Sequence, residues 1–138
     1  MREILFRGKR IYGDEWVDGS LVRFADGCDF ICVQGENMDF LDKFAVIPDT
    51  VGQYTGLTDK NGKKIFEGDI VLFEDESPSN YEYHDCTEMR CGVIEYGDNC
   101  FYITNRIAVE MEDLVYNEKL DVEVIGNIHD NPELLKGE

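Results

Sequence analysis

Glycine-containing turn sequences alternate with short apolar runs, and this alternation constrains the chain more than any other feature. Asp26-Gly27, Asn61-Gly62 and Gly97-Asp98-Asn99 each stand between two runs rich in β-branched and aromatic residues. Asn-Gly and Asp-Gly pairs supply the left-handed backbone angles of tight hairpin turns. Hairpins join antiparallel strands, so the pattern predicts a mainly β fold, and nothing in it requires a parallel sheet.

The first 52 residues are typical of a β-meander. We expect strands at Glu3–Arg7, on both sides of an Asp18-Gly19 turn within Glu15–Phe24, and at 28–33. In the last of these, Cys28, Phe30 and Cys32 share one face, because side chains alternate along a strand.

The central stretch, Gln53–Val71, contains two further turns. Asn61-Gly62 is expected to join the strands Tyr54–Leu57 and Lys63–Phe66 in a hairpin. The Glu67-Gly68-Asp69 turn follows, with Gly68 present for its backbone angles and Asp69 capping exposed amides near the turn. This segment is therefore interpreted as a scaffold that sets the strand register.

Residues 74–88 carry six acids and no Lys or Arg, and they are expected to form a long loop. Gly92–Tyr96 and Cys100–Thr104 then form another hairpin, and Leu120–Ile128 alternates as a strand. The succession predicts a small, strongly bent SH3-like barrel over residues 53–138. We expect one domain over 1–138, in which the meander of 1–52 leads into this barrel.

Three short segments favour helical turns within this mainly β chain. Glu36–Phe44 has apolar residues at a spacing of three, enough for one or two helical turns or an irregular connector, and a strand at 45–47 then stops at Pro48. Ile107–Tyr116 suits a short helix, although its centre equally suits a strand. Asn131-Pro132-Glu133 is a good cap and first turn for a terminal helix.

Negative charge is concentrated in the C-terminal half of the chain. Of the formal charge of −17, residues 1–52 carry −4, residues 53–73 carry zero and residues 74–138 carry −13. Such a surface repels phosphate, so direct nucleic-acid binding is not expected. It is explained either by a well-solvated face or by competition with nucleic acid for a basic partner.

The five cysteines are expected to be free, reduced thiols. They stand at positions 28, 32, 86, 91 and 100, an odd number with irregular spacing that does not suggest a disulfide framework. Zinc held by the pairs 28/32 and 86/91 is the sharper alternative, but the two spacings differ.

No catalytic, cofactor-binding or metal-ligating residue is assigned from the sequence. His84, Asp85 and Cys86 resemble a nucleophilic set, but sequence neighbours seldom adopt the geometry of a triad. Glu67 and Asp69 have cation-binding oxygens without a recognisable spacing, and turn capping explains them as well.

Several motifs resemble the YopX family, whose members are small proteins typical of bacteriophages and prophages. They are RGK at 7–9, EWVDGSL at 15–21, VIPDTVGQYTGLTDKNGKKIFEGDIV at 46–71 and EVIGNIHDNPELL at 123–135. The resemblance spans nearly the whole chain. It implies a phage or prophage origin in a bacterial cytoplasm and leaves homo-oligomerisation open, but it implies no established activity.

These observations favour a binding protein over an enzyme. No run reaches the length of a membrane helix, and the start lacks a signal-peptide pattern, which also favours the cytoplasm. We expect a module that binds an unidentified host or phage protein, with no cofactor. The alternatives are an acidic DNA mimic that blocks a basic host protein and a small metal-dependent hydrolase. The candidate partner surface consists of Gln53, Thr55, Lys60, Glu74, Asp75, Glu76 and Glu82.

Overall fold

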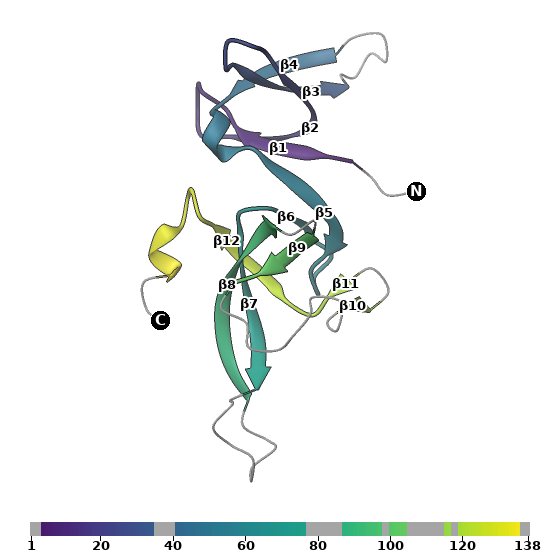
Figure 1. Cartoon of the computed structure of the whole chain (residues 1–138), viewed down its shortest axis with the longest axis vertical. Helices are drawn as coiled ribbons and strands as arrows, with labels where there is room; N and C mark the ends of the chain where they lie inside the picture. Colours follow the sequence, from purple (N-terminus) through teal and green to yellow (C-terminus); the bar gives the residue numbers. More distant parts are fainter. Residues whose placement is uncertain are drawn as a thin grey trace. The chain divides into compact units, whose positions relative to one another are not determined.

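The computed structural model describes residues 4–34, 41–76, 87–97, 100–104, 115–116 and 119–135. The chain divides into two compact units, Met1–Gly56 (unit 1) and Leu57–Glu138 (unit 2). Both are built mainly of β-strands, as expected (Figure 1). The boundary falls inside a strand, close to the predicted division between 52 and 53.

Unit 1 is a meander whose last strand returns beside its first. Each consecutive pair of strands is antiparallel, and the return strand is antiparallel to β1. A bridge between Arg10 and Val46 also joins the end of β1 to the end of β4. The elements are β1 (Phe6–Lys9), β2 (Trp16–Arg23), β3 (Asp29–Gln34), β4 (Leu41–Val46), the 3₁₀ turn η1 (Pro48–Thr50) and β5 (Gly52–Thr58).

Two predictions for unit 1 were wrong. Asp18-Gly19 is not a turn but lies within the continuous strand β2. Gly19 is needed there for close approach, because a Cβ at this position would overlap the carbonyl oxygen of Cys32 on β3. The second error concerns Glu36–Phe44, where 41–44 belong to β4 rather than to a helix and 36–40 lie outside the described residues.

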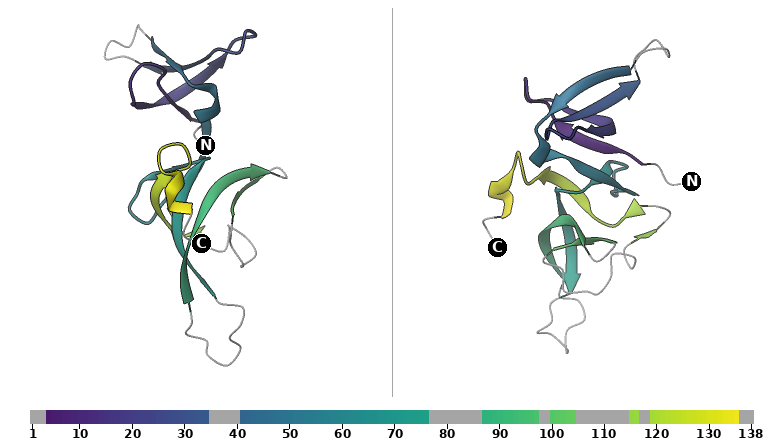
Figure 2. Two further views of the ribbon diagram at one scale, coloured as in Figure 1. Left: turned by 90° about the vertical axis from the view of Figure 1, so that its left-hand side faces the viewer. Right: turned by 45° about the horizontal axis from the view of Figure 1, so that its top comes forward.

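Unit 2 contains a sheet in the order β12-β7-β8-β9, and all its neighbours are antiparallel. β8 is a long, curved strand (Figures 1 and 2). The short β6 pairs with β5, and β11 pairs with β5 in the parallel sense, a pairing that the turn pattern did not require. The elements are β6 (Lys64–Phe66), β7 (Asp69–Glu76), β8 (Thr87–Gly97), β9 (Cys100–Ile103), β10 (Val115–Tyr116), β11 (Lys119–Leu120), β12 (Glu123–Asn127) and the 3₁₀ turn η3 (Pro132–Leu135).

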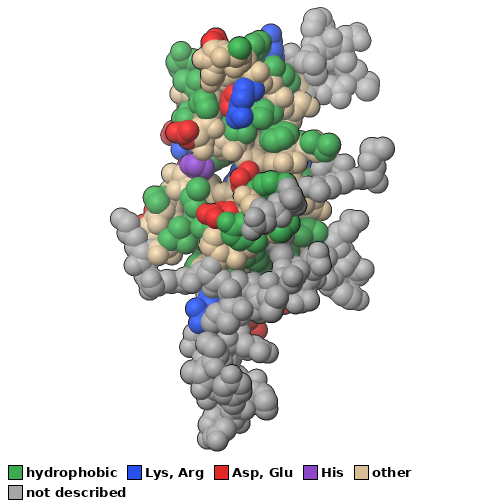
Figure 3. All heavy atoms as spheres, viewed as in Figure 1, with side chains coloured by type: hydrophobic (Ala, Val, Ile, Leu, Met, Phe, Trp, Pro, Cys, Tyr) green, Lys and Arg blue, Asp and Glu red, His purple; other side chains and the backbone are tan. Residues whose placement is uncertain are grey.

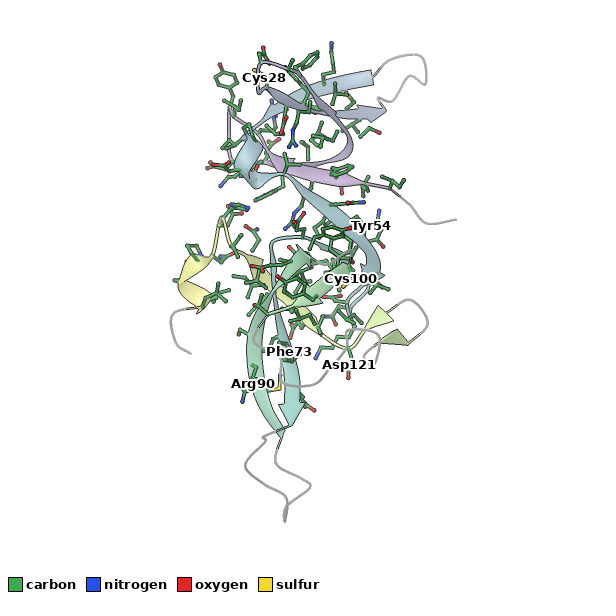
Figure 4. All side chains as sticks on the ribbon, in the orientation of Figure 1. Cys28, Tyr54, Phe73, Arg90, Cys100 and Asp121 are labelled. Atoms are coloured by element: carbon green, nitrogen blue, oxygen red, sulfur yellow. The ribbon has the colours of Figure 1, made fainter. Side chains whose placement is uncertain are left out.

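The core of unit 2 is aliphatic and packs around one phenylalanine. Phe73 on β7 is 2% exposed, and Figure 4 shows it on the strand beside Arg90 of β8, its cross-strand partner. Burial of each such side chain contributes about 1.5–3 kcal/mol. The cluster comprises Ile65, Val71, Phe73, Ile94, Ile103, Leu120 and Val122.

Three expectations for unit 2 need new boundaries. The ends of the predicted acidic loop at 74–88 are strand, because β7 extends to Glu76 and β8 begins at Thr87, and residues 77–86 lie outside the described part. Of the expected helix at 107–116, residues 107–114 lie outside the described part, and Val115–Tyr116 is strand β10. The terminal helix is the 3₁₀ turn η3, which begins at Pro132 as the cap signal suggested.

Candidate functional site

Asp59 organises the turn between β5 and β6. Its Oδ1 accepts hydrogen bonds from the backbone N–H groups of Asn61 and Lys63, each at 2.9 Å, and its Oδ2 accepts one from the N–H of Val124 at 3.0 Å. The side chain is 1% exposed, so these three donors replace its water. Asp59 therefore ties the turn to β12, which is 65 residues away in the sequence.

The turn itself has the conformation that Asn61-Gly62 predicted. Gly62 has a φ of 84°, and its N–H donates to the carbonyl oxygen of Asp59 at 2.9 Å. The N–H of Asp59 in turn donates to the carbonyl oxygen of Lys63 at 2.8 Å. The lysine-bearing residues 60–64 are exposed on this closed turn.

The following turn is also held from within. Gly68 has a φ of 92°, and Asp69 Oδ2 accepts a hydrogen bond from the N–H of Phe66 at 2.8 Å. Asp69 is 1% exposed, so it caps a buried amide rather than facing a ligand in solvent. The central motif is thus a scaffold, as predicted from its turns.

The predicted partner residues are divided between the two units. Gln53 is half-buried and Thr55 is 8% exposed, so Thr55 is not an exposed member of a surface. Lys60 is exposed on the β5–β6 turn, and Glu74 is exposed near the end of β7. The first two belong to unit 1 and the others to unit 2.

The remaining predicted residues can be placed only in part. Asp75 and Glu76 belong to β7, paired with Glu88 and Thr87 of β8. Glu82 lies outside the described residues. Glu74 is therefore the member of the predicted acidic set whose side chain the structure places on a surface.

One face of the unit 2 sheet combines carboxylates with exposed apolar side chains. Residues paired across antiparallel strands project on the same side of the sheet, and so do residues i and i+2 of one strand. The registers Glu74 with Met89, Leu72 with Cys91 and with Glu123, and Glu95 with Tyr102 therefore place these residues on one face. We call this surface the acidic face, and it comprises Leu72, Glu74, Met89, Cys91, Glu95, Tyr102 and Glu123.

The acidic face is interrupted along β8. Met89 is 52% exposed and Tyr102 is 40% exposed, whereas Ile70 and Val93, which lie on the same face between the Glu74–Met89 pair and the Glu95–Tyr102 pair, are buried. The 3₁₀ turn η3 contacts β8. The Tyr102 hydroxyl donates a hydrogen bond to Glu95 Oε2 at 2.9 Å, so an aromatic ring lies beside a carboxylate.

Most of the acidic face was not predicted from the sequence. Only Glu74 was named, because the other six residues come together through the registers of three strand pairs. The one local signal was the alternation Met89, Cys91, Val93 and Glu95 along β8, which marks a common side of a strand.

The described cysteines are free thiols, and they are Cys28, Cys32, Cys91 and Cys100. The Asp26 carboxylate raises the pKa of the exposed Cys28 thiol, so a smaller fraction of this thiol is present as the nucleophilic thiolate at neutral pH. The described residues contain no group of three or more His, Cys, Asp or Glu side chains placed to hold a metal ion. His84, Asp85 and Cys86 lie outside the described part.

Comparison with known proteins identifies the family. A family model described as "YopX protein" matches residues 5–136, nearly the whole chain. The chain belongs to the YopX family. The match confirms the resemblance carried by the motifs from RGK at 7–9 to EVIGNIHDNPELL at 123–135.

The YopX chain is also similar to a solved structure. The crystal structure of protein EF1440 from Enterococcus faecalis shares 28% sequence identity and a TM-score of 0.58, covering 99% of the YopX chain and 100% of that protein. No curated protein matches the YopX chain. Among the residues that the structure describes, no helix is long and apolar enough to cross a membrane. The family and the fold are thereby established without an activity.

Proposed function

We propose that this YopX protein is a protein-binding module of a phage or prophage, acting in the bacterial cytoplasm. Its partner presents a basic segment that also carries apolar side chains, and the acidic face of unit 2 receives it. The observation that supports this proposal is the exposure of Met89 beside Glu74 and of Tyr102 beside Glu95. Tyrosine and methionine are enriched in protein interfaces.

The two kinds of side chain have different roles on this face. The apolar groups lose water on contact and supply most of the affinity. The carboxylates attract a basic partner over about a Debye length and increase the association rate more than the affinity. Residues 74–138 carry −13, so the whole of this half of the chain adds to the attraction.

A capture experiment with matched variants tests the proposal. The full-length protein is immobilised, and captured proteins from a bacterial lysate are identified at low salt. The triple variant Glu74→Gln, Glu95→Gln, Glu123→Gln should capture the basic partner several-fold less well, whereas Asp14→Asn, Asp18→Asn, Asp49→Asn removes as many charges from unit 1. Equal capture by the two triple variants would contradict the assignment to the acidic face.

A DNA mimic is a second candidate, favoured by the strong negative charge of residues 74–138. Adding duplex DNA to the wash distinguishes the two. A partner that binds DNA at the same surface is displaced by the duplex. A partner that stays bound while the acidic-face variant still loses it supports the general binding module.

A further inference from the structure

Unit 1 carries a second surface of different chemistry, on the outer side of β2, β3 and β4. Val22 pairs with Phe30, and Phe30 pairs with Ala45, so these three side chains form a row across the strands. The alternate row contains Ile31, which is fully buried and therefore faces the core. The row of Val22, Phe30 and Ala45 must face outward.

The outward row continues beyond the three strands. The N–H of Ile11 donates to the carbonyl oxygen of Ala45 at 3.0 Å, next to the Arg10–Val46 bridge, which brings Ile11 alongside the row. Phe24 packs edge-on against Phe30, with ring centroids 5.4 Å apart. We call Ile11, Val22, Phe24, Phe30 and Ala45 the apolar row.

The apolar row is accessible to a partner. Ile11 and Phe24 are each 50% exposed, and Val22 is 40% exposed. Figure 3 shows that hydrophobic side chains reach the surface of the molecule beside charged ones. Contiguous exposed apolar side chains of this kind mark interaction surfaces in soluble proteins.

The charge around the apolar row differs from that of the chain as a whole. The neighbouring outward row is Ser20, Cys32 and Lys43, so the two rows together contain one charged side chain, the exposed Lys43. Asp29 on β3 faces the core side, where Arg23 pairs with it at 2.8 Å. In a chain of charge −17, these two rows have a lysine and no carboxylate. The next outward position of β2 is the exposed Asp18, which is paired with Arg7 of β1, and the exposed Asp26 lies in the turn between β2 and β3.

We infer that the apolar row docks a protein segment that carries carboxylates beside its apolar side chains. The apolar groups of the segment would cover Val22, Phe24 and Phe30, and a carboxylate would pair with Lys43. β2 and β3 already have a strand on each side. The segment therefore binds through side chains on the face and not by adding a strand to the sheet.

This assignment goes beyond a single binding face. This step rests on the proposed function, in which the acidic face binds a basic partner. The apolar row binds an acidic one, so each face discriminates against the other face's ligand by charge. The YopX protein would thereby bring two different partners together as an adaptor.

The test uses a displayed library of random peptides selected against the full-length protein. Peptides that bind should contain Asp or Glu beside apolar residues. Phe24→Glu should lower their recovery at least about tenfold, because the lost contact is worth about 1.4 kcal/mol or more. Lys43→Glu should lower recovery several-fold, and Ile4→Glu, at the opposite end of β1 from Ile11, should leave it unchanged.

Several outcomes would overturn the inference. They are selection of basic peptides, equal recovery on Phe24→Glu and the parent, or no peptide enriched on the parent. Sedimentation of the full chain gives another: self-association abolished by Phe24→Glu would make the row a contact between copies. Lys43→Glu decides the matter if circular dichroism shows that Phe24→Glu is unfolded, since exposed Lys43 can be reversed without disturbing the core.

Discussion

At the scale of single residues, two buried aspartates hold unit 2 together. Asp59 and Asp69 each accept backbone hydrogen bonds next to a glycine of positive φ, so each glycine makes a turn and the aspartate holds it closed. A carboxylate satisfies several N–H donors at once, which explains how Asp59 is buried with three backbone partners. These two turns of the central motif therefore encode a structure.

Asp59→Ala should lower the free energy of unfolding by about 2–4 kcal/mol, because three buried or half-buried N–H groups lose their acceptor. Asp59→Asn keeps one oxygen for the turn but can turn an amide N–H₂ toward Val124, so its loss should be intermediate. Urea denaturation measures both. Asp14→Ala, at an exposed site, should change stability by less than about 0.5 kcal/mol, and an equal loss there would disprove the role of Asp59.

Gly62→Val should destabilise the protein by about 1–3 kcal/mol through backbone strain alone. A Cβ at position 62 meets no atom within 4 Å, so no clash contributes. Thermal denaturation against Lys63→Val, at the neighbouring exposed position, provides the comparison. An unchanged melting temperature for Gly62→Val would show that the left-handed turn is not needed.

Asp29 makes stability depend on pH. Hydrogen bonds from the Arg23 guanidinium lower the pKa of the Asp29 carboxyl, against the opposing effect of burial. Because the folded-state pKa lies below the unfolded value of about 3.9, the ion pair stabilises the fold above that value. This contribution is lost as the pH falls through the folded-state pKa.

Asp29→Asn should therefore be less stable than the parent at neutral pH, and the difference should narrow below about pH 4. Urea midpoints measured from about pH 7 to about pH 3 test this. A difference that is constant over the range would mean that the charge of Asp29 contributes nothing and that only its shape matters.

At the scale of strands and turns, local chemistry predicted the positions of hairpin turns better than it predicted which strands pair. Asp26-Gly27 and Asn61-Gly62 form turns as expected, because a left-handed glycine is a local requirement. Asp18-Gly19 is the same dipeptide as Asp26-Gly27, but Gly19 is required because a Cβ there would overlap the backbone of β3. Only the pairing of β2 and β3 reveals this requirement. The prediction for Glu36–Phe44 was wrong for a related reason, because the spacing of its apolar residues does not show that residues 41–46 pair with β3.

Gly92 on β8 has a similar role in packing. A Cβ there would overlap the carbonyl oxygen of Thr104 and the Ile103 side chain, so Gly92→Ala should cost more than about 2 kcal/mol. At Gly97 the nearest neighbour is the Tyr102 ring at 3.1 Å, which is exposed and can move, so Gly97→Ala should cost less. Chemical denaturation of both variants checks the order, and the reverse order would be inconsistent with the strand crossing at Gly92.

At the scale of the whole molecule, charge and fold are largely independent. Antiparallel sheets carry an acidic face in unit 2 and an apolar row without carboxylates in unit 1. Successive side chains along a strand point to opposite faces, so the outward residues can vary while the inward residues keep the core. The uneven charge was visible in the sequence, whereas the two faces required the registers. Composition therefore indicates that the proposed partner of the acidic face is basic, whereas only the registers locate that face.

The charge of −17 should make stability depend on salt. Self-repulsion opposes the compact state and is screened beyond about 10 Å at 0.1 M ionic strength, so the melting temperature should rise by a few degrees between about 10 and 150 mM NaCl. Calorimetry at fixed pH measures the shift. A melting temperature that falls with salt would mean that attractive pairs outweigh repulsion.

The hydrogen bond between Asp59 and Val124 also orders events during synthesis. When the ribosome has made the first 110 residues, every strand of unit 1 has been translated, but β12 has not. Domains generally fold in order from the N-terminus while the chain is being synthesised. Unit 1 can therefore fold before the last strand of unit 2 has been made. A chain that ends before Val124 lacks the N–H that donates to Asp59 Oδ2. A truncation near the C-terminus therefore removes a hydrogen bond from the β5–β6 turn in the middle of the sequence.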